Sequence, residues 1–147
     1  MSGNLITRSR GLLRSLLIYY GIPRRAARLR NFYAQFVPRG GLAFDIGSHV
    51  GNRIRAWRAL GARVVAVEPH PDLLRILRML YGRDEAVTIV AAAVAADEGE
   101  AKLLVDHGNL TVTTLSPEWA REVAEDAGFR RTRWRPVQTV PVLSLIH

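Results

Sequence analysis

Residues 42–71 constrain the fold of this 147-residue chain more than any other stretch. The run over 42–46 is mostly apolar, and it leads into a turn that Gly47 and Gly51 bracket. Glycine can adopt positive φ and lets a ligand approach the backbone closely, because it carries no Cβ. An amphipathic helix follows the turn, and then a valine-rich run over 64–67. This order predicts a β-α-β unit within a parallel sheet.

Two acids at the predicted strand ends indicate the kind of ligand. Glu68 lies 21 residues after Gly47, the separation at which a Rossmann-type acid meets ribose hydroxyls. A nicotinamide dinucleotide favours a middle glycine in the turn, but His49 occupies that position, and Asp45 would repel a pyrophosphate. S-adenosylmethionine (SAM) has no phosphate and carries two cationic groups that an acid attracts. The pattern therefore favours SAM, with an NAD-type dinucleotide-binding module as the alternative.

Two motifs resemble the FkbM family of SAM-dependent methyltransferases: DIGSHVGNR over 45–53 and VVAVEPHPDLLRILR over 64–78. The likeness covers roughly residues 30–147, with Ser48 where the family usually has Ala. It implies a class I methyltransferase fold and O-methylation of a small-molecule, glycan or lipid hydroxyl. The family normally continues with a strand carrying Lys-x-Asp-x-Glu-Gly, so the resemblance predicts the front portion of a longer enzyme, or an inactive truncated remnant that binds SAM.

The expected cofactor site lies in the glycine turn and after the second strand. Its residues are Asp45, Gly47, Ser48, His49, Gly51, Glu68 and Pro69. Asp45 would hold the methionine ammonium, Glu68 would accept from the ribose hydroxyls, and Ala93 or Val94 would border the adenine. No catalytic residue is assigned, although His49 and His107 are candidates for a base that titrates near neutral pH. No metal-ligand spacing is apparent, so no metal is predicted.

The net charge of +8 resides entirely in the first 44 residues, which hold eight arginines and no acid. We therefore predict a basic helical arm over 1–39 and a Rossmann-like SAM-binding domain over 40–147. The arm is interpreted as a solvated basic face, with peripheral membrane contact as the alternative. Nucleic acid is not expected, because the basic run over 130–135 follows an acidic helix. The chain has no cysteine, which fits a reducing cytoplasm.

The remaining periodicities predict an α/β fold with an incomplete sheet. Helices are expected within 12–22, 24–36 and 116–127, and the first of these is amphipathic and too short to span a bilayer. A third strand is expected over 87–95, and a returning hairpin strand over 101–105. Pro141 indicates that a strand over 137–146 lies at a sheet edge. Unless that strand covers it, the first strand should present an unpaired apolar edge that favours self-association.

Overall fold

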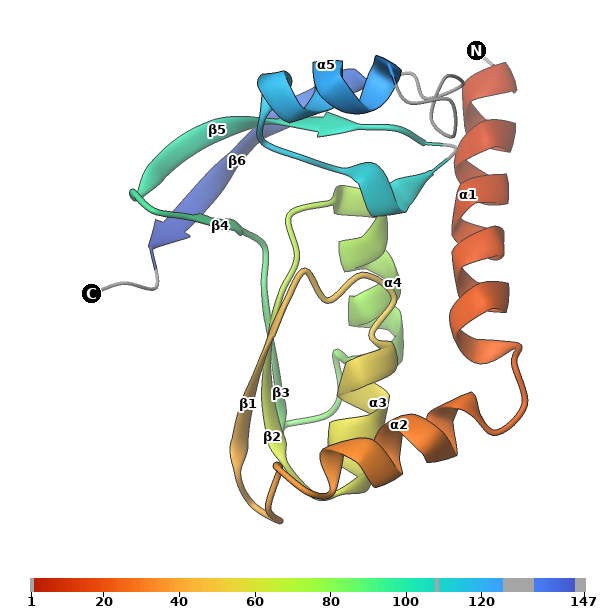
Figure 1. The fold of residues 1–147 in the computed structure, drawn as a ribbon, viewed down its shortest axis with the longest axis vertical. Helices are drawn as coiled ribbons and strands as arrows, with labels where there is room; N and C mark the ends of the chain where they lie inside the picture. Colours follow the sequence, from red (N-terminus) through yellow and green to blue (C-terminus); the bar gives the residue numbers. More distant parts are fainter. Residues whose placement is uncertain (1, 108, 126–133, 145–147) are drawn as a thin grey trace.

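The computed structural model describes residues 2–107, 109–125 and 134–144, which form an α/β fold with two three-stranded sheets (Figure 1). The elements in chain order are α1 (Ser2–Tyr20), α2 (Arg25–Tyr33), β1 (Leu42–Ile46), α3 (Asn52–Ala59), β2 (Arg63–Val67), α4 (Pro71–Tyr81), β3 (Val87–Val90), β4 (Ala93–Ala95), β5 (Gly99–Val105), the 3-10 helix η1 (Leu110–Val112), α5 (Pro117–Glu125) and β6 (Arg135–Ser144).

The first sheet is parallel, with the order β1-β2-β3. Leu42 of β1 pairs with Arg63 of β2, and Val64 of β2 pairs with Val87 of β3. Helices α3 and α4 form the two crossovers, so the predicted β-α-β unit is confirmed, and α4 and β3 extend it. This unit is half of a Rossmann-like fold, in which ligands bind at the carboxyl ends of the strands.

Helices cover one face of this sheet. Ile54 and Trp57 of α3 and Leu77 of α4 pack against Val64 and Ala66 of β2 in the main core cluster. In Figure 1, α1 to α4 all lie on the same side of β1, β2 and β3. The alternating strand pattern directs Val64 and Ala66 toward these helices and the intervening residues toward the opposite face.

The opposite face of β1 is apolar and exposed. Leu42, Phe44 and Ile46 are 51%, 54% and 42% exposed. Among the described residues, β1 pairs with β2 alone, so its other edge is free, as the sequence predicted. Parallel sheets normally have both faces covered. An exposed apolar face on a parallel strand such as β1 is therefore unusual.

The second sheet has the order β4-β6-β5 and corrects three predictions. The predicted strand over 87–95 breaks after Val90, and its last part, β4, joins the second sheet instead. Strand β5 pairs with β6 rather than with the segment before it. Pro141 does not mark an edge, because β6 is the central strand. Among the described residues, β4 pairs with 142–144 of β6, so Pro141 faces no residue of β4. Its missing N–H therefore removes no hydrogen bond between β6 and β4.

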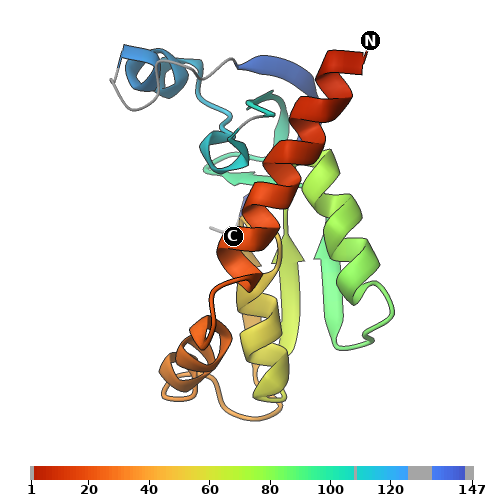
Figure 2. The ribbon, with the colours of Figure 1, turned by 90° about the vertical axis from the view of Figure 1, so that its right-hand side faces the viewer.

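Helix α1 packs along the first sheet's helical layer and reaches the glycine turn. Its Leu12, Leu16 and Tyr19 contact a buried cluster that contains Val50 and Leu73. The amphipathic helix expected within 12–22 is therefore confirmed, although it begins ten residues earlier, at Ser2. Figure 2 shows α1 in front of the other helices, with one long face turned away from both sheets. Within the described ranges, no helix is long and apolar enough to cross a membrane.

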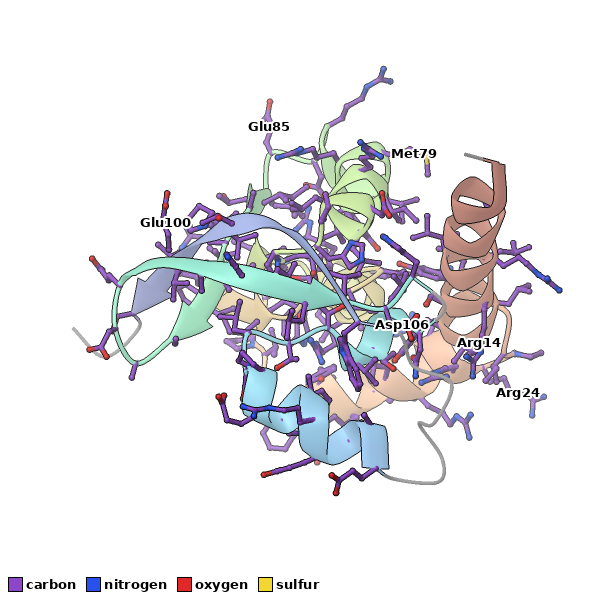
Figure 3. The ribbon with its side chains drawn as sticks, turned by 90° about the horizontal axis from the view of Figure 1, so that it is seen from above. Arg14, Arg24, Met79, Glu85, Glu100 and Asp106 are labelled. Atoms are coloured by element: carbon purple, nitrogen blue, oxygen red, sulfur yellow. The ribbon has the colours of Figure 1, made fainter. Side chains whose placement is uncertain are left out.

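We expect the chain to self-associate through β1, because its apolar side chains gain by leaving water and its edge carries unpaired backbone groups. Phe44→Lys should weaken this association by about tenfold or more, since it places a charge in the centre of the patch. Sedimentation velocity over a concentration series measures the change. Met79→Lys is the control, because Met79 is exposed on α4 and away from β1 (Figure 3). A wild-type chain that stays monomeric throughout the series contradicts the prediction.

Candidate functional site

The glycine turn between β1 and α3 bends through three residues with positive φ, namely Gly47, His49 and Gly51. Its backbone N–H groups are largely used inside the protein. Gly47 N and Ser48 N donate to Val67 O at 2.9 and 3.1 Å, and Gly51 N donates to Ser48 O at 2.9 Å. The turn is thereby fixed to the carboxyl end of β2.

Glu68 completes this attachment from the end of β2. Its carboxylate is buried, with one oxygen accepting from His49 N at 2.8 Å and the other from His70 N at 2.9 Å. Burial raises the pKa of Glu68, while the two backbone hydrogen bonds oppose that rise. The residue predicted to hold the ribose thus also joins the glycine turn to the start of α4.

Asp45 forms an ion pair with Arg53 that was not among the predicted features of the site. Arg53 Nε lies 2.5 Å from Asp45 Oδ1, and Arg53 Nη2 also donates to Gly47 O at 2.9 Å. The Asp45 side chain is fully buried, and its Oδ2 has no hydrogen-bond partner among the described residues. Burial raises the pKa of Asp45, and the nearby Arg53 guanidinium opposes the shift. Arg53 could have been found from its position in the first helical turn after the glycine turn.

His49 is held as a neutral ring. Its imidazole lies 5.1 Å from the Tyr19 ring of α1, and within the described part of the chain neither ring nitrogen has a hydrogen-bond partner. Burial, aided by the positive charge of Arg53, lowers the pKa of His49 to about 4. The expectation that His49 titrates near neutral pH is therefore wrong, because packing against α1 removes water from the ring.

Two tyrosines fix the remaining side of the turn. Tyr20 Oη donates to Val50 O at 2.7 Å, and Tyr81 Oη donates to Gly51 O at 2.9 Å. The two hydroxyl oxygens lie 3.0 Å apart. The turn carbonyls are therefore satisfied by one residue of α1 and one of α4, which makes the arm part of the site's framework.

A cavity of about 180 Å³ opens at the carboxyl ends of β1 and β2. Its lining is mostly apolar and consists of Ile46, Gly47, Val67, Pro69, Ala92, Ala93, Val94, Leu103, Thr113, Thr114 and Leu115. The lining includes Gly47 and Pro69 from the predicted cofactor site. It also includes Ala93 and Val94, the two residues expected near the adenine. A Cβ on Gly47 would meet nothing within 4 Å, so the turn is open to a ligand there.

The other predicted residues do not line this cavity. Asp45, Ser48 and Glu68 are buried beside it. Gly51 packs against α4, where an added Cβ would lie 2.6 Å from Tyr81 Cε2. In this structure the second glycine of the motif permits close helix packing, while Gly47 permits access to the cavity.

A separate cluster joins His70, Asp72 and His107, whose ligand-type atoms lie within 4.8 Å of one another. His70 is the N-cap of α4, and its Nδ1 accepts from Asp72 N at 3.1 Å. A neutral His70 that accepts at Nδ1 carries its proton on Nε2, so Nε2 offers no lone pair to a cation. This arrangement of His70 therefore disfavours a metal site formed by all three side chains.

Comparisons with known proteins show partial likenesses. No family model matches the sequence, and no curated protein matches it. A glycopeptide N-methyltransferase, MtfA, solved with sinefungin, is 20% identical over 44% of this chain and 28% of its own, with a TM-score of 0.38. The C-terminal domain of precorrin-6Y C5,15-methyltransferase from Rhodobacter capsulatus is 14% identical over 78% of this chain and 85% of its own, with a TM-score of 0.37.

This chain spans about a third or less of the length of MtfA and of several other solved methyltransferases that it resembles. Likenesses of this extent identify no family. The resemblance to FkbM proteins therefore stays a prediction from the two sequence motifs.

We predict that Glu68→Ala lowers the free energy of unfolding by about 2 to 4 kcal/mol, because it leaves one buried and one part-buried backbone N–H group without an acceptor. Urea denaturation followed by circular dichroism measures the loss. Glu85→Ala is the matched control, since Glu85 is exposed and points away from the molecule (Figure 3). Equal stabilities of the two variants would show that the Glu68 bridge contributes nothing.

We also predict a pH dependence that originates in His49. Its pKa is lower in the folded chain than the ordinary 6.5, so the unfolded chain binds the proton first. Its contribution to stability is then complete above pH 6.5 and is lost as the pH falls toward 4. We expect about 1 to 2 kcal/mol over this range for a partly buried ring.

The matched variant is His49→Asn, because Asn tolerates positive φ and does not titrate. Its stability should fall less steeply between these pH values than that of the wild-type chain, as urea titrations at each pH would show. If the stability of the wild-type chain and that of His49→Asn change with pH in parallel, the prediction is wrong, and the His49 ring is accessible to water in the folded state.

Proposed function

We propose that this chain binds SAM at the cavity beside Gly47 and forms the cofactor-binding part of a SAM-dependent methyltransferase. The observation that carries the proposal is the internal hydrogen bonding of the glycine turn. The N–H groups of Gly47, Ser48, His49 and Gly51 all donate within the protein. These four N–H groups are therefore not free to form the cradle that a phosphate requires.

A dinucleotide is disfavoured for a second reason. None of the residues that line the cavity is basic, so a pyrophosphate would find no side-chain neutralisation there. The nearest guanidinium, that of Arg53, is already paired with Asp45 and bonded to Gly47 O. A cofactor without phosphate does not place an unneutralised negative charge in this cavity.

The Asp45 and Arg53 pair matches the amino-acid end of SAM. Asp45 Oδ2 is buried and does not line the cavity, so an ammonium would reach its lone pairs only after the side chains around it shift. The part-exposed guanidinium of Arg53 is suited to a carboxylate. Placed side by side, an acid and a base recognise a zwitterion better than either charge alone. Arg53 therefore joins the residues that we assign to cofactor binding.

The apolar cavity is suited to the adenine ring. Its volume of about 180 Å³ is below the roughly 300 Å³ of a pocket that encloses a whole ligand, so it would hold one ring system. Pro69, Ala93 and Val94 supply flat apolar contacts. Glu68 lies next to Pro69, and each of its oxygens retains a lone pair with which it could accept from a ribose hydroxyl.

When bound, SAM supplies an electrophilic methyl group. The residues of this chain would align it by fixing the amino-acid and adenine ends, since methyl transfer is an in-line displacement that depends on orientation. Oxygen on a sugar, lipid or natural product is the acceptor that the FkbM resemblance favours. A hydroxyl acceptor also needs a base. No base is assigned, and His49 is neutral and enclosed by α1.

The test is Gly47→Ala, which adds one methyl group at the mouth of the cavity. Isothermal titration should give SAM binding to the wild-type chain, no binding of NAD, and a loss of about tenfold or more in SAM affinity in the variant. Gly40→Ala is the matched control, because Gly40 also has positive φ and open space around its Cβ. Both variants carry a similar backbone strain of about 1 to 2 kcal/mol, but Gly40 does not line the cavity.

Unchanged SAM affinity in Gly47→Ala, or equal losses in both variants, would remove the glycine turn from the binding site. Binding of NAD in preference to SAM would replace the proposed function with the dinucleotide alternative.

A further inference from the structure

The outer face of α1 combines exposed leucines with uncompensated positive charge. Leu13 and Leu17 are 58% and 60% exposed and lie one helical turn apart, whereas Leu12 and Leu16, one residue earlier in each turn, are partly buried. Ile18, near the end of α1, and Ile22, in the turn after it, are also exposed, by 41% and 44%. We call Leu13, Leu17, Ile18 and Ile22 the outer apolar stripe.

Arginines lie among these apolar residues. Arg10 and Arg14 are exposed on α1, and Arg24 follows the stripe in the turn before α2. In Figure 3, Arg14 and Arg24 both lie on the α1 side of the molecule. No acid occurs before Asp45, and within the described residues the ion pairs of the chain include none of these three arginines. Their charge is therefore available to an anionic partner.

We propose that this face binds an anionic lipid surface, with α1 lying in the plane of the membrane interface. The stripe would enter the boundary between headgroups and acyl chains, and the arginine stems would extend beside it while their guanidinium groups contact lipid phosphates. In this mode of binding, the burial of apolar side chains and the attraction of basic side chains to anionic lipid act together. Within the described residues, exposed apolar side chains and unpaired arginines both occur on the outer face of α1.

The alternatives use only part of this surface. A nucleic acid would neutralise the arginines but would leave the leucines exposed to water, because phosphates offer them no apolar contact. Long exposed leucines on the outer side of a helix stabilise nothing in the isolated chain. A lipid interface is the partner that accounts for both the charge and the apolar side chains.

The inner face of α1 does not need to move for this contact. Tyr19 and Tyr20 hold α1 on the glycine turn, and Arg25 Nη1 donates to Ile18 O at 2.7 Å at the end of the helix. The membrane would therefore meet a helix that is already formed and oriented, which lowers the entropic cost of binding. Folding and lipid binding are expected to be separable by mutation.

The experiment is vesicle flotation of the full chain. Vesicles of phosphatidylglycerol and phosphatidylcholine should carry the protein upward at low salt, and vesicles of phosphatidylcholine alone should carry at least tenfold less. Leu13→Gln with Leu17→Gln should reduce the bound fraction about tenfold, and so should Arg10→Gln with Arg14→Gln. Gln keeps a high helix propensity, and circular dichroism checks that each variant is folded.

Matched controls are available on other surfaces. Leu42→Gln with Phe44→Gln removes two equally exposed apolar residues from β1, on the other side of the first sheet from α1 (Figure 1). Arg63→Gln with Arg83→Gln removes two exposed arginines outside the arm. Both controls should float like the wild-type chain. The proposal fails if the wild-type chain does not float, if the controls lose as much binding as the stripe variants, or if only the arginines matter and duplex DNA binds with equal affinity.

Discussion

The site depends on one buried carboxylate. Glu68 accepts a backbone N–H from the glycine turn with one oxygen and a backbone N–H from the start of α4 with the other. Two segments that are separate in sequence, the glycine turn and residues 68–70, therefore meet at a single carboxylate at the end of β2. Because buried charges are tolerated only when they are hydrogen-bonded, this geometry is strongly constrained. The bond to Glu68 uses the N–H of His49, which is therefore not available to a ligand of the turn.

The helical arm supports the same site from outside. Tyr19 encloses the ring of His49, and Tyr20 bonds the carbonyl of Val50, so α1 controls both the charge state of a turn residue and the position of the turn backbone. The inner face of the arm is thus structural, while its outer face carries the arginines and exposed leucines. A single amphipathic helix can fulfil both roles because its two faces are separated by its 3.6-residue period.

The cavity exists because the chain leaves the first sheet early. After Val90 the backbone passes through Ala92 and enters the second sheet as β4, which is parallel to β6. Leu103 of β5 and the segment over 113–115 then close the cavity opposite the ends of β1 and β2. A continuous third strand, as the apolar run over 87–95 suggested, would not have carried the second sheet to this position.

Local patterns in the sequence determined the first sheet, its helices and the approximate site. Period-2 and period-3.6 repeats predict elements directly, and a parallel unit brings Asp45, Gly47 and Glu68 to the strand ends. Tertiary contacts decided what periodicity does not encode. The division of 87–95 between two sheets, the central place of Pro141, the Asp45 and Arg53 pair, and the lowered pKa of His49 all depend on partners that are distant in sequence or on another element. The sequence thus specified which residues gather at the sheet's carboxyl edge, and packing determined which of them are exposed to a ligand.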